Sequence, residues 1–167
     1  PPVTARELFS LYRVYHGRLS IFSDVRSYLD GTGMVLFQDR HIQRHSTEAR
    51  QPDAGRTHVV RDLDEWMSRH AHEVDKFCMF FGSIEIAQAA LVRFRAFPGI
   101  EAVQGAPDNV EVTAAGVDKG TALLALADRL GIPREATLAI GDSDNDRAML
   151  ARAGVAAVMA NALPEIR

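Results

Sequence analysis

The chain has 167 residues, of which 47% are hydrophobic and 25% charged, a composition that predicts a folded globular protein and excludes a disordered or fibrous one. Its formal net charge of -3 offers no broad positive field for a phosphate backbone, which argues against a nucleic-acid partner. No stretch approaches the roughly 20 apolar residues that span a bilayer, and a single cysteine, Cys78, excludes a disulfide framework. We therefore expect a cytoplasmic protein with no membrane partner and with a small molecule as its ligand.

The first two thirds of the chain alternate short apolar runs with amphipathic helices. Val3, Thr4 and Glu7 have the spacing of a capping box with a hydrophobic staple, and Gly31 with Gly33 marks a hairpin turn. The predicted elements are a helix over 5–15, strands over 19–22 and 34–37, a loop over 39–61, a helix from 62 to 72 with a capping box, a strand over 77–81, a helix capped by Ser83 that carries Ile86, Ala90 and Phe94 on one face, and strands over 100–103 and 110–112. This alternation predicts an α+β domain over residues 1–113, with an antiparallel sheet and helices on one face.

Residues 114–167 have a different order, namely helix, strand, helix, strand. Leu123, Ala127 and Leu130 form the stripe of the first helix, which Gly131 and Pro133 end. Strands are predicted over 137–140 and 155–159, with a second helix between them that ends near residue 154. The order is typical of a parallel, doubly wound α/β sheet, but two strands cannot complete one because a parallel sheet needs further neighbours and cover on both faces. We therefore expect 114–167 to be part of a larger α/β core.

The acidic sequence GDSDND, at residues 141–146, lies where a predicted strand ends and a helix begins. Carboxylates at this edge of a parallel strand face the crevice in which such folds bind ligands, and oxygen ligands suit Mg²⁺. Two simpler interpretations stay open: Ser143 and Asp146 match a capping box, and a surface turn rich in Asp and Asn needs no metal. A calcium-binding EF-hand loop is excluded, because its sixth position is Arg147 instead of glycine and its twelfth is Ala153 instead of glutamate.

Lysine occurs only at Lys76 and Lys119, in a chain that otherwise uses arginine for its positive charge. Lys119 lies beside Gly120, at the start of the helix that precedes the acidic sequence. From there its ammonium group could reach a phosphoryl group in the same crevice and neutralise developing charge. The alternative is an exposed lysine in the first turn of a helix, which needs no ligand.

Together, GVDKGTALLALADRLGI and LAIGDSDNDRAMLARAGVAAVMANA resemble the last two catalytic motifs of the haloacid dehalogenase superfamily, in its Cof-type branch with a type IIB cap. The resemblance is strong over 110–167, and residues 1–113 are similar to the cap that covers the substrate in that branch. It implies an α/β fold in which 114–167 form part of a Rossmann-like core with a parallel sheet and 1–113 form an α+β cap. It also implies a Mg²⁺-dependent phosphatase of a small phosphorylated metabolite such as a sugar phosphate.

The resemblance assigns roles to five residues. Lys119 would hold the phosphate, and Asp142 would ligate Mg²⁺ directly. Asn145 would contact the substrate or its phosphate, Asp146 would support the metal or Lys119, and Asn161 would line the site. The predicted catalytic residues are thus Lys119 and Asp146, the substrate-binding residues Lys119, Asn145 and Asn161, and the metal-binding residues Asp142 and Asp146.

The first motif of that family, DxDGT, carries a nucleophilic aspartate and an acid/base aspartate, and this chain departs from it. The segment most similar to this motif is YLDGT at 28–32, in which Tyr28 occupies the position of the nucleophile. We interpret 30–32 as a hairpin turn, since Asp-Gly is a strong turn signal, and expect the nucleophile and the second motif upstream of Pro1. We therefore expect no turnover from these 167 residues alone. The alternative functions are a non-catalytic binding module that retains the cap, and a phosphomutase.

Overall fold

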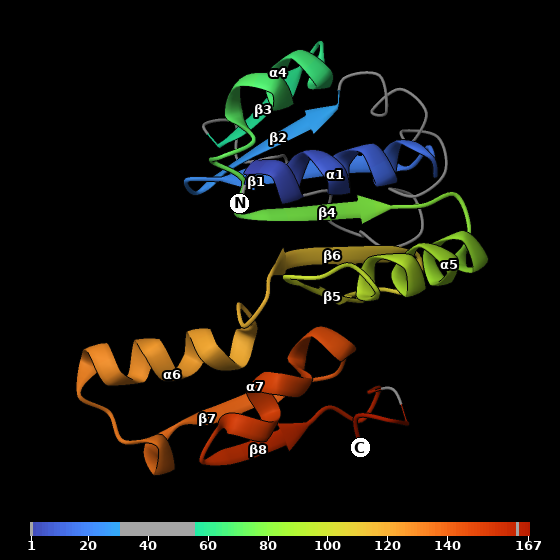
Figure 1. Ribbon diagram of the computed structural model, residues 1–167. Coiled ribbons are helices and arrows are strands. Elements are labelled where there is room, and N and C mark those ends of the chain that lie inside the picture. The colour runs from blue at the N-terminus through green and yellow to red at the C-terminus, as the bar shows by residue number, and fades with distance from the viewer. Residues whose placement is uncertain (1, 31–55, 163) are drawn as a thin grey trace.

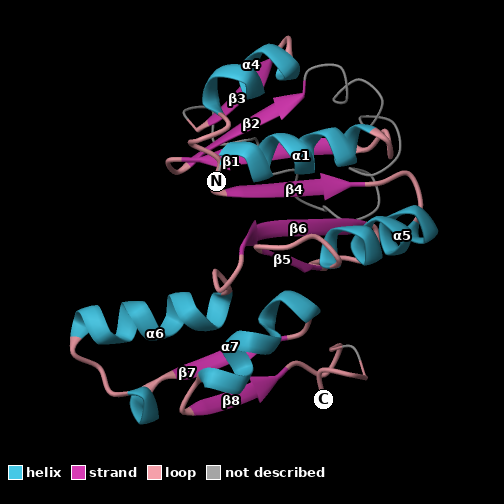
Figure 2. Ribbon diagram, in the orientation of Figure 1, coloured by secondary structure: helices cyan, strands magenta, loops and turns pink. Residues whose placement is uncertain are grey.

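A six-stranded sheet organises the first part of the chain in the computed structural model, which describes residues 2–30, 56–162 and 164–167 (Figures 1 and 2). The strands are β1 (Arg18–Ser23), β2 (Arg26–Asp30), β3 (Thr57–Val60), β4 (Lys76–Phe80), β5 (Ile100–Val103) and β6 (Asn109–Ala114). Their order is β3-β2-β1-β4-β6-β5, and every pair is antiparallel except β2 with β3. The predicted antiparallel sheet is therefore confirmed for most of its pairs.

Three helices cover one face of this sheet: α1 (Pro2–Arg13), α4 (Leu63–His70) and α5 (Ile84–Arg95) (Figure 1). Alternate strand residues point toward these helices, because successive side chains of a strand face opposite sides. The strand side chains in this core that are at most 3% exposed are those of Leu19, Ile21, Phe77, Met79, Val110 and Val112. The predicted caps are also present, since Asp62 accepts a hydrogen bond from the Glu65 N–H at 2.9 Å and Ser83 accepts one from the Ile86 N–H at 3.3 Å.

The last part of the chain has the predicted order of helix, strand, helix, strand. Its elements are α6 (Lys119–Leu130), a 3-10 turn η1 (Arg134–Ala136), β7 (Leu138–Gly141), a second 3-10 turn η2 (Asp144–Asp146), α7 (Arg147–Arg152) and β8 (Val155–Val158). β7 and β8 pair in parallel, and Gly131 ends α6 in the left-handed conformation at φ 67°, which glycine adopts without strain. The described residues contribute only two strands to this sheet.

One face of the two-stranded sheet is apolar and uncovered. Leu138 and Ile140 of β7 lie on it beside Val155 of β8, with exposed fractions of 59%, 58% and 56%. Parallel sheets bury both faces in complete α/β folds, so this face is one that further structure normally covers.

One local prediction for the first sheet was wrong, namely the hairpin partner of its first strand, which is β2. The hairpin that begins with β1 turns at Asp24 and Val25, both at positive φ, because a tight hairpin turn needs positive φ at its two central residues. The sequence does not signal this turn, since it contains no glycine or asparagine. β1 pairs with β2 on one edge and with β4 on the other, whereas the hairpin was predicted with a strand over 34–37. That segment, and the rest of the predicted turn after Asp30, lie outside the described residues.

Two further predictions need correction. The predicted loop over 39–61 contains β3, which pairs in parallel with β2 and extends the sheet. Thr4 does not cap the first helix, because α1 already begins at Pro2. None of the described helices is both long and apolar enough to traverse a lipid bilayer.

The packing of the helices on the sheet can be tested at Phe94, which is fully buried on α5. Phe94→Ala is expected to lower the free energy of unfolding by about 3–5 kcal/mol, because it leaves a cavity in a packed core. Val92→Ala, on the same helix but 68% exposed, is the matched control and should change it by less than about 0.5 kcal/mol. Urea unfolding followed by circular dichroism measures both, and equal midpoints would contradict the packing described here.

Candidate active site

The acidic sequence forms a tight turn between β7 and α7. Oδ2 of Asp146 accepts hydrogen bonds from the N–H groups of Asp142 and Ser143 at 3.1 and 3.3 Å, and lies 3.2 Å from Ser143 Oγ. The capping box expected for Ser143 and Asp146 is therefore present. Asp146 is 6% exposed, so its side chain is an internal part of the turn.

Lys119 lies against this turn from the start of α6. Its ammonium group donates to Asp146 Oδ1 at 2.6 Å and to Asn145 Oδ1 at 3.0 Å. The Lys119 side chain is 48% exposed while that of Asp146 is 9% exposed, so the lysine joins a buried carboxylate to an open surface. The structure thus brings Lys119 together with Asn145 and Asp146, which lie 26 and 27 positions further along the sequence.

Local features of the fold explain why Lys119 reaches the turn. Asp118 caps α6 by accepting from the Thr121 N–H at 2.7 Å, so Lys119 is the first helical residue. Gly120 lies against α7, and a Cβ there would be 2.4 Å from the Ala148 carbonyl oxygen. The absence of a side chain at Gly120 therefore allows α6 to approach the turn closely.

The charge of Asp146 is stabilised by its neighbours. Burial alone would raise the pKa of this carboxyl group, but the hydrogen bond and charge of Lys119 and the N–H groups of Asp142 and Ser143 hold the pKa below its usual value. Asp146 is therefore ionised at neutral pH, and it fixes the position of the Lys119 ammonium group.

Asp142 and Asn161 follow the ends of β7 and β8, at the edge where parallel strands bind ligands. Asn161 Nδ2 donates to Asp142 Oδ2 at 3.3 Å, so both side chains lie at the same edge. Carboxylate and amide oxygens fit a hard cation such as Mg²⁺. The described part of the chain holds no group of three or more His, Cys, Asp or Glu side chains placed for a metal ion, so these residues supply only part of a ligand set.

A pocket of about 710 Å³ lies between the six-stranded sheet and the start of α6. On one side it is lined by Lys76, Glu111 and Thr113, on the face of the sheet that the helices leave uncovered, and on the other by Lys119 and Asn145. The volume is within the range of sites that hold small ligands. A small molecule held by Lys119 would therefore also contact the six-stranded sheet.

Three direct contacts join α5, the segment between β5 and β6, and β6 itself to the acidic turn beside this pocket. Arg95 forms an ion pair with Asp144 at 2.8 Å, and the Asn145 N–H donates to the Gln104 carbonyl oxygen at 3.2 Å. Asn145 Nδ2 also donates to Glu111 Oε2 at 3.4 Å. From the sequence, Lys76 was notable only as one of two lysines. Arg95, Gln104 and Glu111 were not predicted as site residues, because no motif signals contacts between distant elements.

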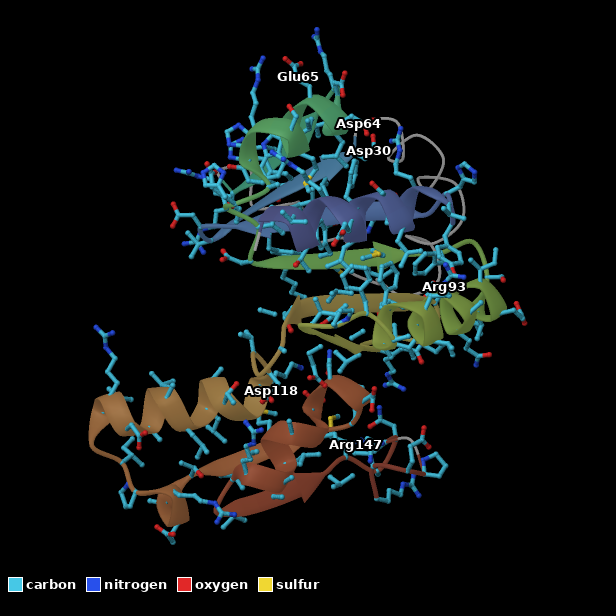
Figure 3. All side chains as sticks on the ribbon, viewed as in Figure 1. Asp30, Asp64, Glu65, Arg93, Asp118 and Arg147 are labelled. Atoms are coloured by element: carbon cyan, nitrogen blue, oxygen red, sulfur yellow. The ribbon has the colours of Figure 1, made fainter. Side chains whose placement is uncertain are left out.

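The described residues of the YLDGT sequence, 28–30, do not take part in this site. Tyr28 lies in β2 and packs on the Trp66 ring with centroids 4.6 Å apart. Figure 3 shows Asp30 in the upper part of the view, well away from Asp118 and Arg147 in the lower half. The nucleophile of the predicted chemistry is therefore not supplied by Tyr28 or Asp30.

The family model of the haloacid dehalogenase-like hydrolases matches residues 2–167. Among curated proteins, the chain is 36% identical over 91 residues to the 5-amino-6-(5-phospho-D-ribitylamino)uracil phosphatase YcsE of Bacillus subtilis, a match that covers 54% of this chain and 36% of that protein. It is 38% identical over 98 residues to the HMP-PP phosphatase of Cronobacter sakazakii, covering 58% of this chain and 36% of that one. The matches thus span about a third of the length of these relatives.

Solved structures show the same fold. A haloacid dehalogenase-like hydrolase from B. subtilis superposes with a TM-score of 0.77 at 25% identity, over 97% of this chain and 61% of that one. The HAD subclass IIB sugar phosphatase BT4131 superposes with a TM-score of 0.74 at 18% identity, over 99% of this chain and 58% of that one. Both cover nearly all of this chain, so the arrangement of its two sheets has counterparts of known structure.

The charge pairing in the turn can be tested at Lys119. Lys119→Met is expected to raise the pKa of Asp146, because burial of the carboxylate then acts without the ammonium group. A carboxylate with a lowered folded pKa stabilises the fold above its unfolded pKa of about 4, and the stabilisation is lost as pH falls through the folded value. The variant should therefore lose less stability than the parent chain on acidification from about pH 6 to pH 3.

Carbon NMR titration of the aspartate carboxyl groups measures this pKa directly, and unfolding at several pH values measures the stability. Arg129→Met, which removes the same charge from an exposed position of α6, is the control and should leave the pKa of Asp146 unchanged. An unchanged pKa of Asp146 in Lys119→Met would contradict the assigned ion pair.

Proposed function

Because the chain belongs to the family of haloacid dehalogenase-like hydrolases, whose model matches residues 2–167, we propose that it is part of a Mg²⁺-dependent phosphatase that hydrolyses a small phosphorylated metabolite, such as a sugar phosphate. Relatives that match its sequence are named as phosphatases, and a superposed structure is named as a sugar phosphatase. These names support a small phosphorylated compound as substrate. We also propose the cytoplasm as the location of the protein.

The observation that carries the proposal is the convergence of Lys119 and Asn145 on one side of an open pocket. The Lys119 ammonium group would bind a phosphate oxygen and neutralise the charge that develops on it. Asn145 would bind the phosphate or the adjoining part of the substrate. Asp146 would hold Lys119 in place, because Lys119 and the backbone of the turn already occupy both of its oxygens.

Asp142 would be the direct protein ligand of Mg²⁺ within this chain, with Asn161 beside it. The bound cation would supply further charge neutralisation at the phosphate. Asp146 contributes to such a site indirectly, because its donors fix the backbone of the turn that carries Asp142. The oxygen chemistry of these residues fits Mg²⁺, and water, substrate and groups outside the described residues would complete the ligand set.

We also propose the division into a cap over 1–113 and part of a core over 114–167. In the described residues no strand of the six-stranded sheet pairs with β7 or β8, and α6 follows a short link of residues 115–118. The pocket between the two parts would hold the leaving group against the cap. The uncovered apolar face of β7 and β8 supports a larger core, whose remaining strands would carry the nucleophilic aspartate.

The test uses the longest natural reading frame that contains this chain. Phosphate release from a panel of phosphorylated metabolites is expected with Mg²⁺ and should be abolished by a chelator. Lys119→Met should lower kcat by about 10²- to 10³-fold, because it removes a donor from the phosphate, whereas Arg129→Met should leave kcat unchanged.

Product analysis of the same reactions separates hydrolysis from phosphoryl transfer to a second hydroxyl group. The 167 residues alone are expected to release no phosphate. Ordinary metal-dependent turnover by those residues alone, or full activity of Lys119→Met in the longer protein, would contradict the proposed roles.

A further inference from the structure

Glu111 lies on the face of the six-stranded sheet that looks toward the acidic turn. Its neighbours on β6, Val110 and Val112, point into the helix-covered core, so the carboxylate projects from the opposite face. Lys76 of β4 donates to Glu111 Oε2 at 2.8 Å, and the two side chains are 32% and 18% exposed. This ion pair holds the carboxylate in place at the wall of the pocket.

Glu111 lines the pocket and also contacts Asn145, whose amide contacts Lys119. Asn145 Nδ2 donates to Glu111 Oε2 at 3.4 Å, while Asn145 Oδ1 accepts from Lys119 Nζ at 3.0 Å. A carboxylate can only accept and an ammonium group can only donate, so the two neighbours demand the same orientation of the amide. A rotated amide would set its NH₂ group against Lys119 and its oxygen against Glu111, which are two repulsive contacts.

The backbone between β5 and β6 passes close to the side chains of Asn145 and Glu111. A Cβ at Gly105 would lie 2.8 Å from Asn145 Nδ2 and 3.0 Å from Glu111 Oε1. The adjacent Gln104 carbonyl oxygen accepts from the Asn145 N–H at 3.2 Å. The backbone of Asn145 is therefore held by the segment that joins β5 to β6, and its side chain lies close against Gly105 of that segment.

We propose that Glu111 is a positioning residue of the phosphate site, which acts through Asn145 on Lys119. The chain of contacts runs from Lys76 through Glu111, Asn145 and Lys119 to Asp146, and it is complete only while the sheet contacts the turn. The inference rests on the proposed function in taking Lys119 as the phosphate contact. It adds that the six-stranded sheet orients the groups that bind phosphate, so its effect does not depend on the leaving group.

The experiment uses the longest natural reading frame that contains the chain, with the variants Glu111→Leu and Glu111→Gln. The affinity for inorganic phosphate is measured by titration calorimetry, and kcat/KM is measured for p-nitrophenyl phosphate and for a hexose phosphate. Glu111→Leu should raise the phosphate Kd and lower both kcat/KM values by a common factor of about ten, since a hydrogen bond to a charged group is lost. Glu111→Gln should have a smaller effect, because its amide oxygen still accepts from Asn145.

Glu7→Gln, which removes a carboxylate from an exposed position of α1, is the control and should leave all three quantities unchanged. Circular dichroism melting identifies any variant that does not fold. If Glu111→Leu fails to fold, the phosphate Kd of Glu111→Gln provides the test, because that variant keeps the size and polarity of the side chain. A raised Kd supports the positioning role and an unchanged Kd overturns it.

The possible results distinguish the positioning role of Glu111 from the proposed phosphatase activity. A loss confined to one of the two substrates would overturn the positioning role, since Glu111 would then select the leaving group. An unchanged phosphate Kd, or a parent protein that binds no phosphate, would overturn it as well. Weaker phosphate binding in Glu111→Leu by a protein that hydrolyses neither substrate would refute the proposed hydrolysis and support the positioning role.

Discussion

The ion pair between Lys119 and Asp146 is the interaction on which the site depends. It joins the first residue of α6 to a turn at the end of β7, and it compensates the burial of the Asp146 carboxylate. The same carboxylate accepts from the backbone of Asp142 and Ser143, so one side chain holds both the lysine and the turn. A buried charge needs such partners, because an uncompensated one would be strongly destabilising. The shape of the turn and the position of the lysine are therefore consequences of a single requirement.

The two sheets differ in how their faces are covered. Among the described residues, three helices bury one face of the six-stranded sheet, and the polar side chains of Lys76 and Glu111 project from the other face toward the turn. The two-stranded sheet instead exposes Leu138, Ile140 and Val155 on one face. A polar uncovered face is stable in water, whereas an apolar one is covered in complete parallel sheets. The first part of the chain thus packs a core of its own, and the exposed apolar face of the second supports the larger core proposed above.

Features that depend on neighbouring residues could be predicted from the sequence, whereas features that depend on distant segments could not. Asp62 and Ser83 were predicted as helix caps because a cap depends on residues three positions apart. The hairpin turn at Asp24 and Val25 was missed because its residues are not those usual at positive φ. β3 was taken for loop because it is an edge strand of four residues, half of them exposed, and its pairing with β2 comes from a distant segment.

The sequence by itself determined the order of helix, strand, helix and strand in residues 114–167, the start of α6 at Lys119 and its end at Gly131, and the identity of GDSDND as an acidic turn after a strand, since each follows from local geometry. Its motifs also determined the family. Only the tertiary structure decided that Lys119 lies 2.6 Å from Asp146 and that Glu111 contacts Asn145. These contacts join residues 27 and 34 positions apart, and they depend on how helices and strands pack, which no short motif encodes.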